Sequence, residues 1–276
     1  PGSPEIQNLI PTTYFGTTAT AGGIIGVLMA LLIMLAGGYA LKYMANRAAA
    51  NGESFDLPEG YGEEAVSKES LVSFLNAIIP LVILVGGFNL LSHYISVIEA
   101  LLAAMVASLL IGYVLFRKTI EAPGKMISEG SENALIAISN TCAVVGFGAV
   151  AAQSPAFANI VAFLTDMPGL EYAGLAVAVT VIAGITGSAS GGLGIALPIL
   201  APIYQGMGLD NGAMHRISAI ASGGLDSLPH NGYVVTTIRA ICKETHQRAY
   251  PAAFVVSVLI PLPVLGIAVL LYSIFA

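Results

Sequence analysis

The run Gly187-Ser188-Ala189-Ser190-Gly191-Gly192-Leu193-Gly194 lies in the middle of an apolar segment that extends from Leu175 to Ile203. Four glycines in eight residues cannot hold a regular helix well, so we expect an unwound stretch here. Within a membrane, such a break exposes amides that favour an anion, and carbonyls and hydroxyls that suit a cation. Ser188, Ser190, Gly191 and Gly192 are therefore candidate binding residues.

The same residue types allow a second interpretation. Gly, Ala and Ser let membrane helices approach each other closely, so the run could serve packing instead of binding. The density of glycine exceeds what packing alone requires, which favours an unwound stretch.

The composition indicates that the solvent of this chain is lipid. Of its 276 residues, 56% are hydrophobic and 9% are charged, whereas ordinary soluble domains have about 25% charged residues. A formal charge of −6 argues against nucleic acid as a partner.

The two cysteines indicate no cross-link and no metal. Cys142 and Cys242 lie in apolar segments without metal-ligand spacing, so we expect neither a disulfide nor a metal site.

Several apolar runs are long enough to cross a bilayer, which takes about 20 helical residues. Four are plain: 21–43, 71–91, 95–116 and 251–275. Three others are interrupted by small polar residues, and we expect a re-entrant hairpin at 132–164 and broken helices at 170–204 and 213–242. A full span with a short return fits 132–164 almost as well. The sequence predicts an all-α polytopic membrane protein with about seven membrane segments.

The charged residues divide and orient the chain. Residues 1–45 contain one span, 46–70 form an acidic soluble loop, and 71–276 form a larger membrane unit. With a hairpin at 132–164, nine of the ten Lys and Arg residues fall on one face, and Arg216 is the exception. The positive-inside rule makes that face cytoplasmic.

A second interruption covers Ser222–Gly232, where Pro229 removes a backbone donor and three glycines relax the chain. Asp226 and His230 lie inside it. Because an ionisable group is costly to bury in a membrane, Asp226 is the candidate for binding or relaying a coupling cation, with His230 as its partner. The alternative is a loop at the membrane surface, where both side chains are solvated.

The triplet Ser139-Asn140-Thr141 interrupts another apolar stretch. Three adjacent polar side chains point to different sides of a helix, so the segment must be buried or unwound. We predict substrate contacts from Asn140 and Thr141. The alternative is hydrogen bonding back to helix carbonyls and across to a neighbouring helix.

These motifs resemble the gluconate permease (GntP) family of the ion transporter superfamily. The resemblance covers the whole chain and is carried by residues 1–8, 11, 14–17, 140–148, 187–194 and 222–232. It implies a secondary transporter built from two inverted repeats, of which residues 1–45 contain the end of the first and 71–276 form the second. It also implies that Ser3, in the first motif, contacts substrate. The triplet at Ser139 is similar to the hairpin-tip motif of the related divalent anion:sodium symporters, and this resemblance implies an ion contact from Ser139.

The leading hypothesis is symport of a small organic anion, such as gluconate or another sugar acid or hydroxycarboxylate, driven by H⁺ or Na⁺. Asn231 would join Asn140 and Thr141 in contacting substrate hydroxyls. We expect a bacterial inner membrane, no cofactor beyond the coupling ion, and a second copy of the chain as a candidate partner. Two alternatives remain: a cation/proton antiporter without organic substrate, and an intramembrane serine protease that uses Ser190 and His230.

Overall fold

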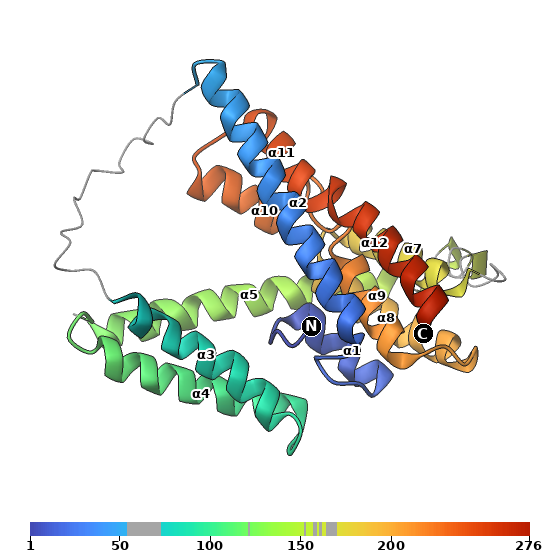
Figure 1. The fold of residues 1–276 in the computed structure, drawn as a ribbon, viewed down its shortest axis with the longest axis horizontal. Helices are drawn as coiled ribbons and strands as arrows, with labels where there is room; N and C mark the ends of the chain where they lie inside the picture. The colour runs from blue at the N-terminus through green and yellow to red at the C-terminus, as the bar shows by residue number, and fades with distance from the viewer. Residues whose placement is uncertain (54–72, 121, 152, 157–158, 160–161, 164–169) are drawn as a thin grey trace.

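The computed structural model describes residues 1–53, 73–120, 122–151, 153–156, 159, 162–163 and 170–276 of the chain. Helices joined by turns and loops make up these described residues, and no strand is found among them. The prediction of an all-α protein is confirmed. Figure 1 shows long helices in two groups, the pair α3 and α4 on one side and a larger bundle on the other, with α5 running between them. Most of the predicted loop 46–70 lies outside the described residues.

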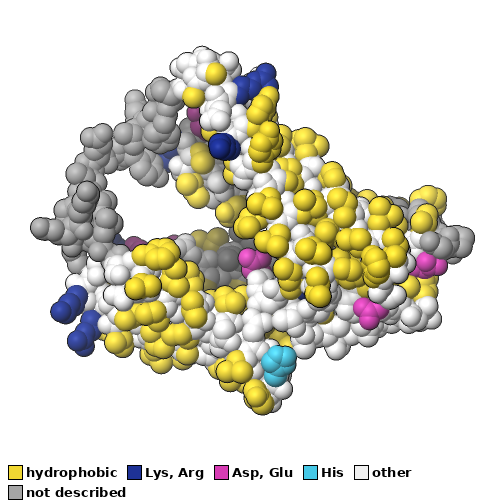
Figure 2. All heavy atoms as spheres, in the orientation of Figure 1, with side chains coloured by type: hydrophobic (Ala, Val, Ile, Leu, Met, Phe, Trp, Pro, Cys, Tyr) yellow, Lys and Arg dark blue, Asp and Glu magenta, His cyan; other side chains and the backbone are white. Residues whose placement is uncertain are grey.

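Four helical segments within the described residues are long and apolar enough to cross a membrane. They are α2 (Gly23–Ala50), α3 (Phe74–Leu91), α4 (Val97–Phe116) and the continuous stretch His246–Phe275, which contains α11 (His246–Phe254), the π-helical turn η3 (Val255–Leu259) and α12 (Pro261–Phe275). These helices match the four plain runs of the sequence. Figure 2 shows hydrophobic side chains over the exposed surfaces of both groups, as a lipid environment requires.

The helix α2 runs further than its apolar stretch. We expected residues from 46 onward to be a loop, but α2 continues to Ala50 and carries Arg47 in its last turn. The added residues are good helix formers, and a cation near the last carbonyls complements the helix dipole.

The helices α3 and α4 pack against each other as an antiparallel pair. A capping box fixes the start of α4, because the Ser96 hydroxyl accepts from the Glu99 amide while the Glu99 carboxylate accepts from Ser96. Further along the pair, the Ser108 hydroxyl donates to the Pro80 carbonyl at 2.8 Å. Phe88 is completely buried near this contact surface. Glu99 therefore caps a helix at its solvated end.

The buried core lies in the larger bundle. It is formed by α1 (Ile6–Phe15), α7 (Glu171–Thr186), α8 (Ala189–Gly206) and α9 (Asn211–Ser222), with one side of α12 packed against them. Tyr204 and Leu193 of α8 and Met214 of α9 have no exposed surface. The helices α7, α8 and α9 are rich in Gly, Ala and Ser, which allows the close approach on which membrane helix packing depends.

The chain reverses direction between α7 and α8. A Cβ atom built on Gly192 would lie 2.6 Å from the Cα of Ala183, and the Asp210 amide after α8 donates to the Tyr172 hydroxyl at the start of α7 at 3.1 Å. We expected a broken helix at 170–204, but the interruption is the tip of an antiparallel hairpin formed by α7 and α8. It is also shorter than expected, because helix resumes at Ala189.

Replacing Gly192 with alanine is expected to force α7 and α8 apart, because the added methyl would meet the backbone of Ala183 at 2.6 Å. We expect a loss of about 2–4 kcal/mol in the free energy of unfolding, as for overpacked cores. Gly206→Ala, in the same helix with no atom within 4 Å of an added Cβ, is the matched control. Thermal unfolding in detergent would compare the two, and equal melting temperatures would contradict the tight hairpin.

The second interruption separates α9 from α10 (Gly232–Thr236), and the π-helical turn η2 (Thr237–Ile241) continues α10. No regular helix forms at residues 223–231. Together, residues 211–241 form a broken helix at the place where the sequence predicted one. One part, α9, comes before Asp226 and Pro229 in the chain, and the other, α10 with η2, comes after them.

The helix α5 (Pro123–Ala151) continues through the triplet at Ser139 without a break. The triplet therefore does not form the tip of a hairpin, and any turn of the predicted hairpin 132–164 must come after Ala151. Helical hydrogen bonding satisfies the backbone there. The alternative interpretation, in which the side chains bond to helix carbonyls and to a neighbouring helix, stays a prediction, because the side chains of Asn140 and Thr141 lie outside the described residues. Much of the rest of 132–164 lies outside the described residues, so the hairpin itself stays a prediction.

The two ends of the bundle differ in charge. Arg47 lies in the last turn of α2, and η3 packs against this helix. Arg239 lies in η2, Lys243 in the connection that follows it, and Arg248 in α11. At the other end, the Tyr272 hydroxyl donates to the Gly22 carbonyl at 2.6 Å, and Arg216 lies beside it. Arg216 thus lies away from Arg47, Arg239, Lys243 and Arg248. The topology inferred from charge took 170–204 as one crossing, which the hairpin of α7 and α8 does not make, so the side on which Arg216 lies stays a prediction.

Candidate substrate and ion site

The hairpin tip is a two-residue turn. Gly187 has a φ of 59°, a left-handed conformation that ends α7 and favours glycine. The hydroxyl of Ser188 then caps α8 by accepting from the Gly191 amide at 3.1 Å. The Thr186 hydroxyl closes the turn by donating to the Ser188 carbonyl at 3.2 Å. The tip is therefore held by its own polar groups.

Asn231 joins this tip to the second interruption. Its Nδ2 donates to the Gly187 carbonyl at 2.8 Å and to the Asp226 carbonyl at 2.9 Å. Its Oδ1 accepts from the Val234 amide at 2.8 Å and so caps α10. Only 8% of Asn231 is exposed. One buried amide thus satisfies three backbone groups and links two breaks that lie 44 residues apart in sequence.

Further contacts fix the broken helix along the hairpin. The Thr180 hydroxyl of α7 donates to the Ala221 carbonyl of α9 at 3.1 Å. A Cβ atom on Gly184 would lie 2.9 Å from the Cβ of Leu225, and one on Gly187 would lie 2.8 Å from the imidazole of His230. The second interruption therefore lies along α7 and contacts it from Thr180 to the hairpin tip at Gly187.

The Asp226 carboxylate is half-buried in the second interruption and accepts from the Ser227 hydroxyl at 2.9 Å. The His230 side chain is exposed and lies against Gly187, and no ion pair links it to Asp226 within the described residues. The structure also holds this loop from the other side, since the Tyr250 hydroxyl of α11 donates to the Ser227 carbonyl at 3.2 Å.

The other predicted site residues divide into two sets. Ser190, Gly191 and Gly192 lie in the first turn of α8, next to the tip. Ser139 is exposed on α5, which packs against α8, and the side chains of Asn140 and Thr141 lie outside the described residues. Ser3 lies elsewhere, because its carbonyl accepts from Asn8, a residue bonded to Arg216 near Gly22. The structure brings together the tip and the second interruption, but not Ser3.

Where the hairpin tip meets the second interruption, groups with opposite partial charges lie near each other. The first turn of α8 points its amides out of the tip, and the amides of Ala189 and Ser190 have no hydrogen bond among those found for the described residues. These amides and the serine hydroxyls favour an anion. Asp226 and the carbonyls around it favour a cation. The arrangement can therefore hold an anion and a cation side by side.

Sequence reasoning missed a second polar centre, built on Arg216 in α9. Only 5% of this residue is exposed, and it makes no ion pair within the described part of the chain. Its guanidinium donates to Asn8 Oδ1 at 2.8 Å, to the Ala19 carbonyl at 3.1 Å and to the Ala21 carbonyl at 2.7 Å. Neighbouring His215, also buried, is 2.6 Å from the Thr17 hydroxyl through Nδ1.

This Arg216 centre holds the N-terminal segment against α9. A Cβ on Gly26 would lie 3.0 Å from the Arg216 side chain, so the start of α2 packs closely over it. The signal was present in the sequence, since an arginine apart from all other cations in a membrane chain needs internal partners. Those partners are mainly carbonyls, which no sequence pattern identifies.

The chain is similar to a protein of Bacillus subtilis strain 168 named as an uncharacterized transporter, YxjC. The two are 31% identical, and the match covers 94% of this chain but 63% of that protein. The chain therefore spans less than two thirds of the length of this relative. No family model and no solved structure matches the chain.

Proposed function

We propose that the chain forms the binding core of a secondary transporter that carries a small organic anion together with H⁺ or Na⁺. The observation that carries the proposal is the hydrogen bond from Asn231 to the Gly187 carbonyl, which joins two interrupted helices. Interrupted helices near the bilayer midplane are the usual sites of secondary transporters. The named relative, a transporter, supports the same class.

In this proposal the substrate carboxylate binds at the first turn of α8. The donors for it are the hydroxyl of Ser190 and the amides of Ala189 and Ser190, which have no hydrogen-bond partner among the described residues. The coupling cation binds at Asp226, on the other side of the Asn231 bridge. The cationic ends of α2 and of η2 then face the cytoplasm of a bacterial cell.

Asp226→Asn is expected to abolish gradient-driven uptake, because the amide removes the negative charge that binds the cation. The assay is uptake of radiolabelled gluconate into proteoliposomes under an imposed proton or sodium gradient. Asp210→Asn is the matched control, because Asp210 caps α9 through its Oδ1 and asparagine caps a helix equally well. If coupled uptake persists in Asp226→Asn, the ion role is wrong.

The same assay separates the alternatives. No uptake across a panel of sugar acids and hydroxy acids, with cation/proton exchange intact, would favour an antiporter. Among the described residues no hydrogen bond joins Ser190 to His230, so the geometry of a serine nucleophile is not present in this conformation.

A further inference from the structure

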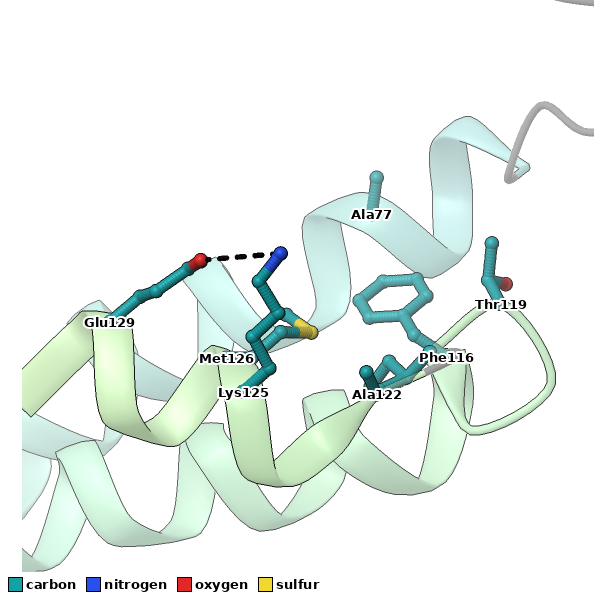
Figure 3. Close-up of a pocket in the computed structure, with 8 residues that line it drawn as sticks. Ala77, Phe116, Thr119, Ala122, Lys125, Met126 and Glu129 are labelled. Atoms are coloured by element: carbon teal, nitrogen blue, oxygen red, sulfur yellow. Dashed lines mark ion pairs between the residues drawn. The ribbon is translucent and has the colours of Figure 1, made fainter.

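A cavity of about 590 Å³ lies at one end of the α3–α4 pair, away from the proposed transport site. Figure 3 shows it between the first turns of α3, the end of α4 and the first turns of α5. The residues that line it are Ala77, Phe116, Thr119, Ile120, Ala122, Lys125, Met126 and Glu129.

The lining of the cavity has an apolar part and a charged part at its opening. Phe116, Met126 and Ala77 supply the apolar wall in Figure 3, and Lys125 and Glu129 lie at the edge. The Lys125 Nζ is 3.7 Å from the Glu129 carboxylate, and these side chains are 75% and 60% exposed. That distance is longer than a hydrogen bond, so each charge can still bind another group.

The position of the cavity matches the boundary between lipid and water. Phe74 begins one candidate span and Phe116 ends the other, so the cavity lies where both helices leave the apolar layer. The exposed cations Arg117 and Lys118 follow at once. A molecule that fits needs an apolar body and a head with adjacent negative and positive charges.

We propose that this cavity binds the head of an aminophospholipid, such as phosphatidylethanolamine. Its phosphate contacts Lys125, its primary ammonium donates to Glu129, and its glycerol and upper acyl carbons pack on Phe116 and Met126. Glu129 disfavours a purely anionic head, which would bring a second negative charge beside the carboxylate. A choline head has no N–H to donate to Glu129.

The absence of tryptophan from the chain allows a direct test. Phe116→Trp places a single tryptophan in the cavity, and Tyr113→Trp places one on α4 at a side chain that is 54% exposed. Each variant is reconstituted in phosphatidylcholine containing equal fractions of brominated ethanolamine, choline or glycerol phospholipid. At Phe116→Trp we expect the ethanolamine lipid to quench at least about threefold more effectively than the choline lipid.

At Tyr113→Trp the three lipids should quench equally, because this position contacts bulk lipid. Adding Glu129→Gln to Phe116→Trp should bring the ethanolamine-to-choline ratio close to one. Glu244→Gln is the matched control, since Glu244 forms a similar i,i+4 pair with Arg248 and lines no part of the cavity. Equal quenching by all lipids at Phe116→Trp, stronger quenching by the glycerol lipid, or an unchanged ratio in Glu129→Gln would each overturn the proposal.

Discussion

Arg216→Ala is expected to lower the free energy of unfolding by about 3–5 kcal/mol, the largest loss for any single side chain outside the proposed substrate and ion site. The substitution removes the donors to Asn8, Ala19 and Ala21 and leaves the Ala21 carbonyl without its partner among the described residues. The Ala21 carbonyl is half-buried, and a carbonyl shielded from water costs more when it loses its hydrogen bond than the bond contributed.

The measurement is thermal or denaturant unfolding of the purified chain in detergent. Arg216→Lys should lie between the wild type and Arg216→Ala, because a single ammonium keeps the charge but cannot span three acceptors in one plane. Arg248→Ala, whose guanidinium is on a side chain that is 74% exposed, should change stability by less than about 0.5 kcal/mol. Equal stability of Arg216→Ala and Arg248→Ala would show that the Arg216 centre does not hold the N-terminal segment.

Asn231→Ala is expected to abolish uptake and to cost about 2–4 kcal/mol of stability. It removes the bonds to Gly187 and Asp226 and the cap of α10 in one step. Without them the hairpin tip and the second interruption are free to move apart, and the anion and cation sites lose their common frame.

A second substitution of Asn231 tests whether the bridge affects uptake independently of the stability of the fold. Asn231→Asp keeps the cap of α10 but turns a carboxylate oxygen toward the Gly187 and Asp226 carbonyls, which repel it. We expect this variant to fold and to transport at less than about a tenth of the wild-type rate, a change of about 1.4 kcal/mol in the barrier. Asn211→Ala is the control, because Asn211 is exposed and accepts only a long bond from Gln205 at 3.4 Å. Full uptake by Asn231→Asp would contradict a functional bridge.

The sequence predicted the features that depend on local composition. The four spans follow from apolar length, and both interruptions follow from glycine and proline, which disturb a helix wherever it packs. The reversal at Gly187 was not predictable, since it depends on the contact of Gly192 with Ala183 on the facing helix. We considered two interpretations of the glycine run, a break in the helix and close helix packing. Each holds at a different residue, since Gly187 makes the turn and Gly192 allows close packing.

The candidate site was also predictable only in part, because some of its features depend on contacts between residues far apart in the sequence. Gly and Ser next to a break and Asp226 within one are local signals. Asn231 was expected to contact substrate, but its observed bonds are to backbone carbonyls of its own loop and of the hairpin tip. The burial of Arg216 depends on carbonyls 195 and 197 residues away, which no local pattern reveals. Tertiary contacts of the backbone, and not residue types, set these positions.

The central claim is that an organic anion binds at the first turn of α8, and protection of that turn from chemical labelling tests it most directly. Ser190→Cys is made in a chain whose exposed cysteines, Cys142 and Cys242, are replaced by alanine, with Thr20→Cys as the exposed control. Gluconate or another transported acid, together with the coupling cation, should slow labelling of Ser190→Cys by a charged thiol reagent at least about threefold and leave Thr20→Cys unaffected. An unchanged labelling rate at Ser190→Cys, under conditions in which the reconstituted chain accumulates the same anion, would contradict the account.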